Sequence, residues 1–217
     1  MFRVIAARPT GLLAVLSLAL ALVAGAPGSA GAQEDAAAGR VEATSGAVAV
    51  IRGGVSARLA PDDPVLVGDQ VVTGEAGKVV IALQGGGTLT AGPGSRVTVA
   101  DYARGAEDRG VFDMLAGIFR ASLEPGDPWD RFEVQSRTAV ASARNTEFIV
   151  EASALNTAVV TLSGRVGVTA RAPAAAGATV ELGPGEGTDV ARGALPTPPA
   201  TWGAPRVRAF DDRTTLP

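Results

Sequence analysis

The sequence predicts an all-β protein, built as a sandwich, a barrel or a solenoid of short strands. Two patterns lead to this fold class. Short runs of valine, isoleucine, leucine and threonine alternate with polar residues at period two, which is typical of strands with one buried face. Glycine and proline clusters close these runs roughly every ten residues, and the chain contains 28 glycines and 14 prolines.

The alternation is clearest in four runs along the chain. In Arg96–Val99 the two valines share one face, and the arginine and threonine share the other. In Glu147–Glu151 the side chains of Phe148 and Val150 lie opposite the two glutamates. We expect the apolar face of each run to be buried. The four runs are Lys78–Leu83, Arg96–Val99, Glu147–Glu151 and Arg165–Val168.

Glycines divide two further segments. Val111–Leu123 has a pattern that a helix could share, but Gly117 in its middle disfavours a helix, so we expect strand, turn, strand. Gly164 follows a serine and precedes the run Arg165–Val168, and a small residue, a glycine and a strand also occur around Gly46 and Gly117. The unequal spacing of these glycines fits either a weak internal repeat or a common β-turn.

The first 32 residues have the three regions of an export signal. Two arginines, an apolar run at Gly11–Ala26 and the small-residue pattern Ala30-Gly31-Ala32 follow one another. The run is shorter than the ~20 residues that span a membrane. We therefore expect a signal peptide at 1–32 that is cleaved after about Ala32, with an uncleaved N-terminal anchor as the alternative. A short flexible lead is expected at 33–39.

The remaining chain is expected to be exported, to the periplasm or the cell envelope. No second long apolar run follows, so we expect no stable membrane insertion after cleavage. Cleavage would leave 17 basic and 22 acidic residues, a net charge of −5. A nucleic-acid partner is not expected, because it would require a clustered basic face.

The composition excludes several classes of chemistry. The chain has no histidine and no cysteine, which removes histidine-based triads, thiol nucleophiles, Cys/His zinc sites and disulfides. Lys78, the single lysine, fits a solvated strand edge better than a serine–lysine dyad. We predict that the protein is not an enzyme and that it has no catalytic residue, cofactor or metal site.

One acidic loop leaves a glycan-binding or glycan-acting role open. Trp129 lies between Asp127 and Asp130, and two carboxylates beside an aromatic ring are one form that a sugar site takes. The alternative is an ordinary acidic loop after Pro-Gly.

The C-terminal segment 193–217 differs in texture from the rest of the chain. It is rich in proline and poor in apolar residues, so we expect an extended, partly polyproline tail. Trp202 and Phe210 within it either dock on the domain or form exposed contacts for a partner.

The order of several motifs resembles the FecR domain, the extracytoplasmic domain of the ferric-citrate uptake regulators. The resemblance covers about Arg40–Val190, and we place the domain at 40–192. The segments that carry it are Gly68–Gly74, Gly77, Val79–Leu83, Thr88-Leu89, Pro93, Ser95, Val97, Val99, Gly110–Phe119, Phe132–Ser136, Arg144–Val150 and Val159–Val168. The resemblance implies a twisted solenoid-like or sandwich arrangement of short strands.

The motif around Asn145 departs from the FecR pattern in one informative way. Asn145 stands where the family usually has glycine, at a position that we expect to need a positive φ, which asparagine tolerates. We interpret Arg144, Asn145 and Thr146 as a tight turn that leads into the next strand, with Phe148 anchored in the core. The other interpretation is that Arg144 or Glu147 contacts a partner.

The resemblance also implies a role. FecR-type regulators carry a cytoplasmic anti-sigma segment and one membrane helix, and here a signal peptide takes the place of both. We therefore expect a non-catalytic binding, scaffolding or sensing module whose partner is another, unidentified envelope protein, bound for example at an exposed strand edge. The alternatives are a sigma-factor or iron-uptake signalling component that works with a separate membrane protein, and a glycan module that uses Trp129.

Overall fold

The structure, a computed structural model, describes residues 37–124, 126–127, 129–172 and 177–216. The expected signal peptide at 1–32 and the first part of the expected lead lie outside the described residues. The remainder of that lead was predicted wrongly as flexible, because residues 37–39 already belong to the first strand and Ala38 is buried.

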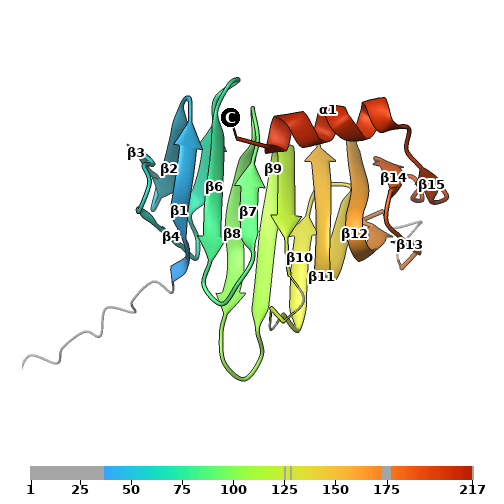
Figure 1. Cartoon of the computed structure of the whole chain (residues 1–217), viewed down its shortest axis with the longest axis horizontal. Coiled ribbons are helices and arrows are strands. Elements are labelled where there is room, and N and C mark those ends of the chain that lie inside the picture. The colour runs from blue at the N-terminus through green and yellow to red at the C-terminus, as the bar shows by residue number, and fades with distance from the viewer. Residues whose placement is uncertain (1–36, 125, 128, 173–176, 217) are drawn as a thin grey trace, which may run out of the picture. The chain divides into compact units, whose positions relative to one another are not determined.

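The described residues form fifteen strands and one helix (Figure 1). In chain order these are β1 (Ala37–Ser45), β2 (Val48–Arg52), β3 (Val55–Arg58), β4 (Pro64–Leu66), β5 (Gln70–Thr73), β6 (Lys78–Leu83), β7 (Thr88–Ala91), β8 (Arg96–Ala103), β9 (Arg109–Ser122), β10 (Arg131–Gln135), β11 (Ala139–Ala152), β12 (Asn156–Ala170), β13 (Thr179–Leu182), β14 (Glu186–Ala191), β15 (Ala200–Thr201) and α1 (Ala204–Thr214).

These strands belong to one continuous mixed sheet, which folds over into two layers. It does so because three long strands change partners midway. The first half of β9 pairs with β8 and β10, and its second half pairs with β7 and β11. The first layer is therefore β4-β1-β6-β7-β9-β11-β12-β14-β15, and the second is β3-β2-β5-β8-β9-β10-β11-β12-β13. The all-β prediction is confirmed.

Each of the three long strands bends at a residue with positive φ. The φ angle is 104° at Gly117 in β9, 49° at Asn145 in β11 and 77° at Gly164 in β12. These positions lie where each strand exchanges one set of neighbours for another. The strand–turn–strand prediction for 111–123 was wrong, because Gly117 bends one continuous strand without ending it.

The core lies between the two layers and contains most of the aromatic side chains. Four phenylalanine rings form a continuous row with centroid separations of 5.4–6.3 Å, in the order Phe119, Phe112, Phe132 and Phe148. Phe148 has no exposed surface, which confirms its predicted role as a core anchor. Valines from both layers complete this cluster.

Helix α1 covers the outer face of the first layer, and it runs across β9, β11 and β12 (Figure 1). Phe210 packs there in a second apolar cluster with Ile118, Ile149 and Val160, and its ring lies 5.4 Å from that of Trp202. The prediction of an extended segment over 193–217 was wrong for residues 204–214, whereas the docking alternative for the two aromatic side chains is confirmed. Pro205 in the first turn is compatible with a helix because no intrahelical donor is lost there.

Candidate binding edge at strand β3

Strand β3 is one of the two edge strands of the second layer, and β13 is the other. It forms a hairpin with β2 through Gly53-Gly54, whose φ angles of 55° and 82° are those of a two-residue type I′ turn. Among the described residues, β3 pairs with β2 alone. All four of its residues are exposed, and 69% of Val55 is accessible.

The hairpin register determines which backbone groups face outward. Arg52 and Val55 close the turn as a hydrogen-bonded pair, so Ala57 is the next residue that bonds to β2. The bond from the Leu59 amide to the Val48 carbonyl continues this alternation. The amide and carbonyl groups of Ser56 and Arg58 therefore point to the free side, where another extended chain can bond to them.

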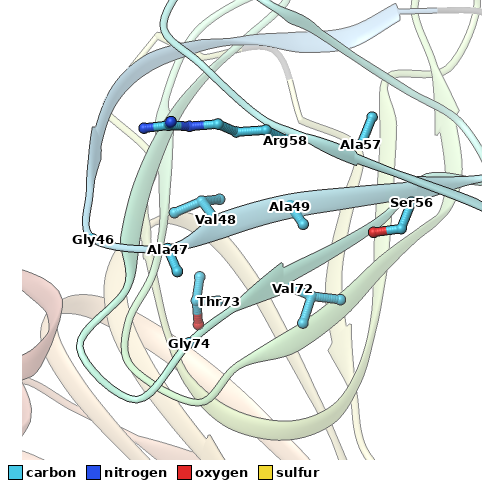
Figure 2. Close-up of a pocket in the computed structure, with 10 residues that line it drawn as sticks. All are labelled: Gly46, Ala47, Val48, Ala49, Ser56, Ala57, Arg58, Val72, Thr73 and Gly74. Atoms are coloured by element: carbon cyan, nitrogen blue, oxygen red, sulfur yellow. The ribbon is translucent and has the colours of Figure 1, made fainter.

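A hollow of about 680 Å³ lies beside this edge (Figure 2). Small residues line it: Ala47 precedes β2 and Ala49 lies within it, while Val72 lies on β5 and Gly74 follows that strand. The rim includes Arg58, whose side chain extends beside the hollow in Figure 2. The edge and the hollow together can hold a strand and its alternate side chains.

The hairpin is braced by an ion pair between the partly exposed Arg52 and the buried Asp69. Asp69 is fully buried, and its two carboxylate oxygens accept hydrogen bonds from Nε and Nη2 of Arg52, each at 2.7 Å. The Leu66 amide donates to the same carboxylate at 2.8 Å. A buried carboxylate is tolerated only when it is paired and hydrogen-bonded in this way, so Asp69 orients the β2–β3 hairpin.

The predicted motif at Arg144, Asn145 and Thr146 lies elsewhere, inside β11. It is a bulge in mid-strand and was predicted wrongly as a turn before a strand. The buried Thr146 hydroxyl donates to the Arg144 carbonyl at 2.6 Å and accepts from the Arg165 amide at 3.2 Å. The structure brings Gly164 to the same bulge, where a Cβ atom would lie 2.6 Å from Thr146 Oγ1. Positive φ at Asn145 is confirmed.

Glu147 lies near this bulge and is engaged within the chain. Its Oε1 accepts two hydrogen bonds from Arg120, at 2.6 and 3.0 Å. Nη1 of Arg120 also reaches Asp211 of α1 at 2.5 Å. This carboxylate therefore helps to hold α1 against the sheet, a role that the sequence pattern did not indicate.

Trp129 does not form the sugar platform that the acidic loop suggested. Its side chain is 5% exposed and packs edge-on against Tyr102 and Phe132, with centroid separations of 5.5 and 5.4 Å. Asp127 and Asp130 accept hydrogen bonds from backbone amides of nearby loops. Because the indole is covered, it cannot stack on a ligand from solvent.

Known proteins share parts of this sequence and fold. Residues 69–167 match the model of the FecR protein family. This stretch is similar to a FecR domain. Two crystal structures of a candidate anti-sigma factor from Parabacteroides distasonis ATCC 8503, at 1.65 and 2.50 Å resolution, share the fold with a TM-score of 0.52 and 17% identity. The match covers 65% of this chain and 63% of the bacterial protein. No curated protein matches the chain.

The FecR family is in general extracytoplasmic, regulatory and non-enzymatic. In the part of this chain that the structure describes, no helix is both long enough and apolar enough to cross a membrane. The FecR match begins at Asp69 and so includes the carboxylate that braces the hairpin. The edge strand β3 precedes the matched residues.

Proposed function

We propose that this FecR domain is a non-catalytic binding module of the periplasm or cell envelope, which binds an extended segment of another envelope protein along β3. The observation that carries the proposal is the free edge at Ser56 and Arg58, which lies beside a hollow of small side chains. Main-chain hydrogen bonds supply affinity in such a complex, and the hollow selects the side chains of the partner.

The charge at the edge indicates the character of the bound segment. Within the described residues, Arg58 has no ion pair, and its side chain borders the hollow. A segment with small apolar residues and one carboxylate matches this surface. The unpaired guanidinium would gain a charge-assisted hydrogen bond on binding.

A sigma-factor regulatory system is the setting that the FecR match favours for this module. The fold shared with a candidate anti-sigma factor is consistent with that setting. In this version of the proposal, the bound segment belongs to a separate membrane protein that carries the signal inward.

Substitution of Ser56 by proline tests the edge. The Ser56 amide faces away from β2, so Ser56→Pro removes an outward donor and leaves the bonds to β2 in place. Ser56→Ala is the matched control, because it removes the hydroxyl and keeps the amide. Both variants are expected to unfold close to the wild-type urea midpoint.

Partner capture provides the measurement. A photo-crosslinking side chain at position 57 in intact cells is expected to trap an envelope protein in the Ser56→Ala background and to lose it in the Ser56→Pro background. Equal capture in both backgrounds, or capture only by crosslinkers placed away from β3, would exclude this edge as the binding surface.

A further inference from the structure

A second hollow, here called the arginine hollow, lies on the outer face of the second layer and has a volume of about 700 Å³. Its floor is a row of side chains at paired positions on four adjacent strands, with one leucine beside them. These residues are Gln70, Thr98, Asp113, Leu115 and Gln135. Three arginines that follow strand ends form its rim, namely Arg137, Arg171 and Arg192. The volume lies in the range of small-molecule sites.

The charge of this hollow differs from that of the chain as a whole. The protein has a formal net charge of −3, yet three arginines and one aspartate meet here. In the described part of the chain, the guanidinium groups of Arg137 and Arg192 have neither an ion pair nor a hydrogen bond. Arg171 donates to the Ser136 carbonyl at 2.9 Å, which holds its side chain in place. Arginine at such a site favours a carboxylate or a phosphate.

The floor indicates that the ligand carries hydroxyl groups as well as charge. The Asp113 carboxylate has no hydrogen-bond donor among the described residues, and it would repel a bare anion. A sugar hydroxyl can donate to it. The Gln135 amide donates to Glu133 at 3.0 Å and the Thr98 hydroxyl accepts from Gln70 at 3.2 Å, and each retains capacity for one further hydrogen bond. Leu115 is 39% exposed and supplies an apolar surface for the carbon face of a ring.

We propose that the arginine hollow binds an acidic saccharide, in which the rim arginines hold the carboxylate or phosphate group and Asp113 accepts from a ring hydroxyl. The saccharide is either a free sugar acid or the repeating unit of an envelope polysaccharide. The site is separate from the β3 edge and does not depend on it.

Calorimetric titration of the whole protein at low salt tests the proposal. Glucuronate and glucose 6-phosphate are expected to bind. Glucose, which lacks the anionic group, and inorganic phosphate, which lacks the sugar ring and its hydroxyls, are expected to bind at least about tenfold more weakly. Trigalacturonate that binds tighter than galacturonate would identify a polymeric source, and equal affinity would identify a free sugar acid.

Charge variants locate the binding. Arg137→Gln with Arg192→Gln is expected to weaken glucuronate binding by about tenfold or more, and these side chains have no internal partner whose loss would unfold the protein. Arg165→Gln with Arg208→Gln removes the same charge outside the hollow and is expected to leave affinity unchanged, since the ion pair of Arg165 with Glu181 is exposed. Binding of inorganic phosphate as tight as that of glucuronate, equal losses in both double variants, or no binding of any sugar acid would overturn the proposal.

Discussion

The bend in β12 can be tested at Gly164, because the same strand carries a matched control at Gly167. At Gly164 the φ angle is 77°, and a Cβ atom would lie 2.6 Å from Thr146 Oγ1 and 2.7 Å from the Asn145 carbonyl oxygen. The left-handed conformation alone costs a residue with a Cβ about 1–2 kcal/mol. Crowding against backbone atoms adds about 1–3 kcal/mol. Gly164→Ala is therefore expected to lower the free energy of unfolding by about 2–5 kcal/mol.

Gly167→Ala is expected to raise the free energy of unfolding, whereas Gly164→Ala lowers it. The φ angle of Gly167 is not in the positive region, and the nearest atoms to an added Cβ lie 3.9 Å away. Alanine fits there without strain and reduces the conformational entropy of the unfolded chain, which stabilises the protein by about 0.4–1 kcal/mol.

Urea unfolding followed by tryptophan fluorescence measures both changes. The slope of the free energy against urea should stay the same, because neither substitution alters the surface exposed on unfolding. If the unfolding free energies of the two variants differ by less than about 0.5 kcal/mol, a glycine is not required at position 164. The explanation that this glycine lets β12 bend from one layer into the other would then be wrong.

Three further predictions follow from the packing and the charges. Phe148→Ala should cost about 3–5 kcal/mol in urea unfolding, because the ring is fully buried between the layers; a loss below 1 kcal/mol would contradict this. Phe210→Ala should release α1 before the sheet unfolds, since an isolated helix of this length is marginal, and hydrogen exchange should then lose protection at 204–214 but not in β9. The hydrogen bonds from Arg131 lower the pKa of Glu133, so this pair stabilises the fold above the unfolded-state pKa and ceases to do so as pH falls through the folded-state pKa. Glu133→Gln is expected to cost at most about 1 kcal/mol at pH 6, because the side chain of its partner Arg131 is about half exposed. This difference in unfolding free energy from wild type should shrink as the pH falls from 6 to 2. A difference that stays constant would contradict the assignment.

The sequence predicted the local states of individual residues more accurately than their place in the fold. Positive φ at Asn145 and burial of Phe148 were both anticipated, because each depends on the residue's own chemistry and immediate neighbours. The same pattern around Asn145 suggested a turn, whereas the chain continues as one strand and changes partners. A bulge and a turn require the same φ angle, so only the neighbouring strands distinguish them.

Helix α1, near the C-terminal end, is another element that the local sequence pattern did not predict. The C-terminal segment is rich in proline, which disfavours a helix prediction. Only Phe210 and Thr214 of the helix are buried, so the helix has little apolar periodicity. The apolar face that α1 covers is contributed by β9, β11 and β12, which lie far away in sequence. A helix that is stabilised by a distant surface leaves little periodicity of its own to detect.

Alternating apolar residues and glycine punctuation were sufficient to establish an extended, all-β chain, and the absence of histidine and cysteine was sufficient to exclude whole classes of chemistry. These properties reside in single residues and their nearest neighbours. Contacts between segments tens of residues apart determine which strand keeps a free edge and which arginines converge on one hollow. Such contacts exist only after the chain has closed into layers, so the candidate binding surfaces emerge from the packing and not from any motif.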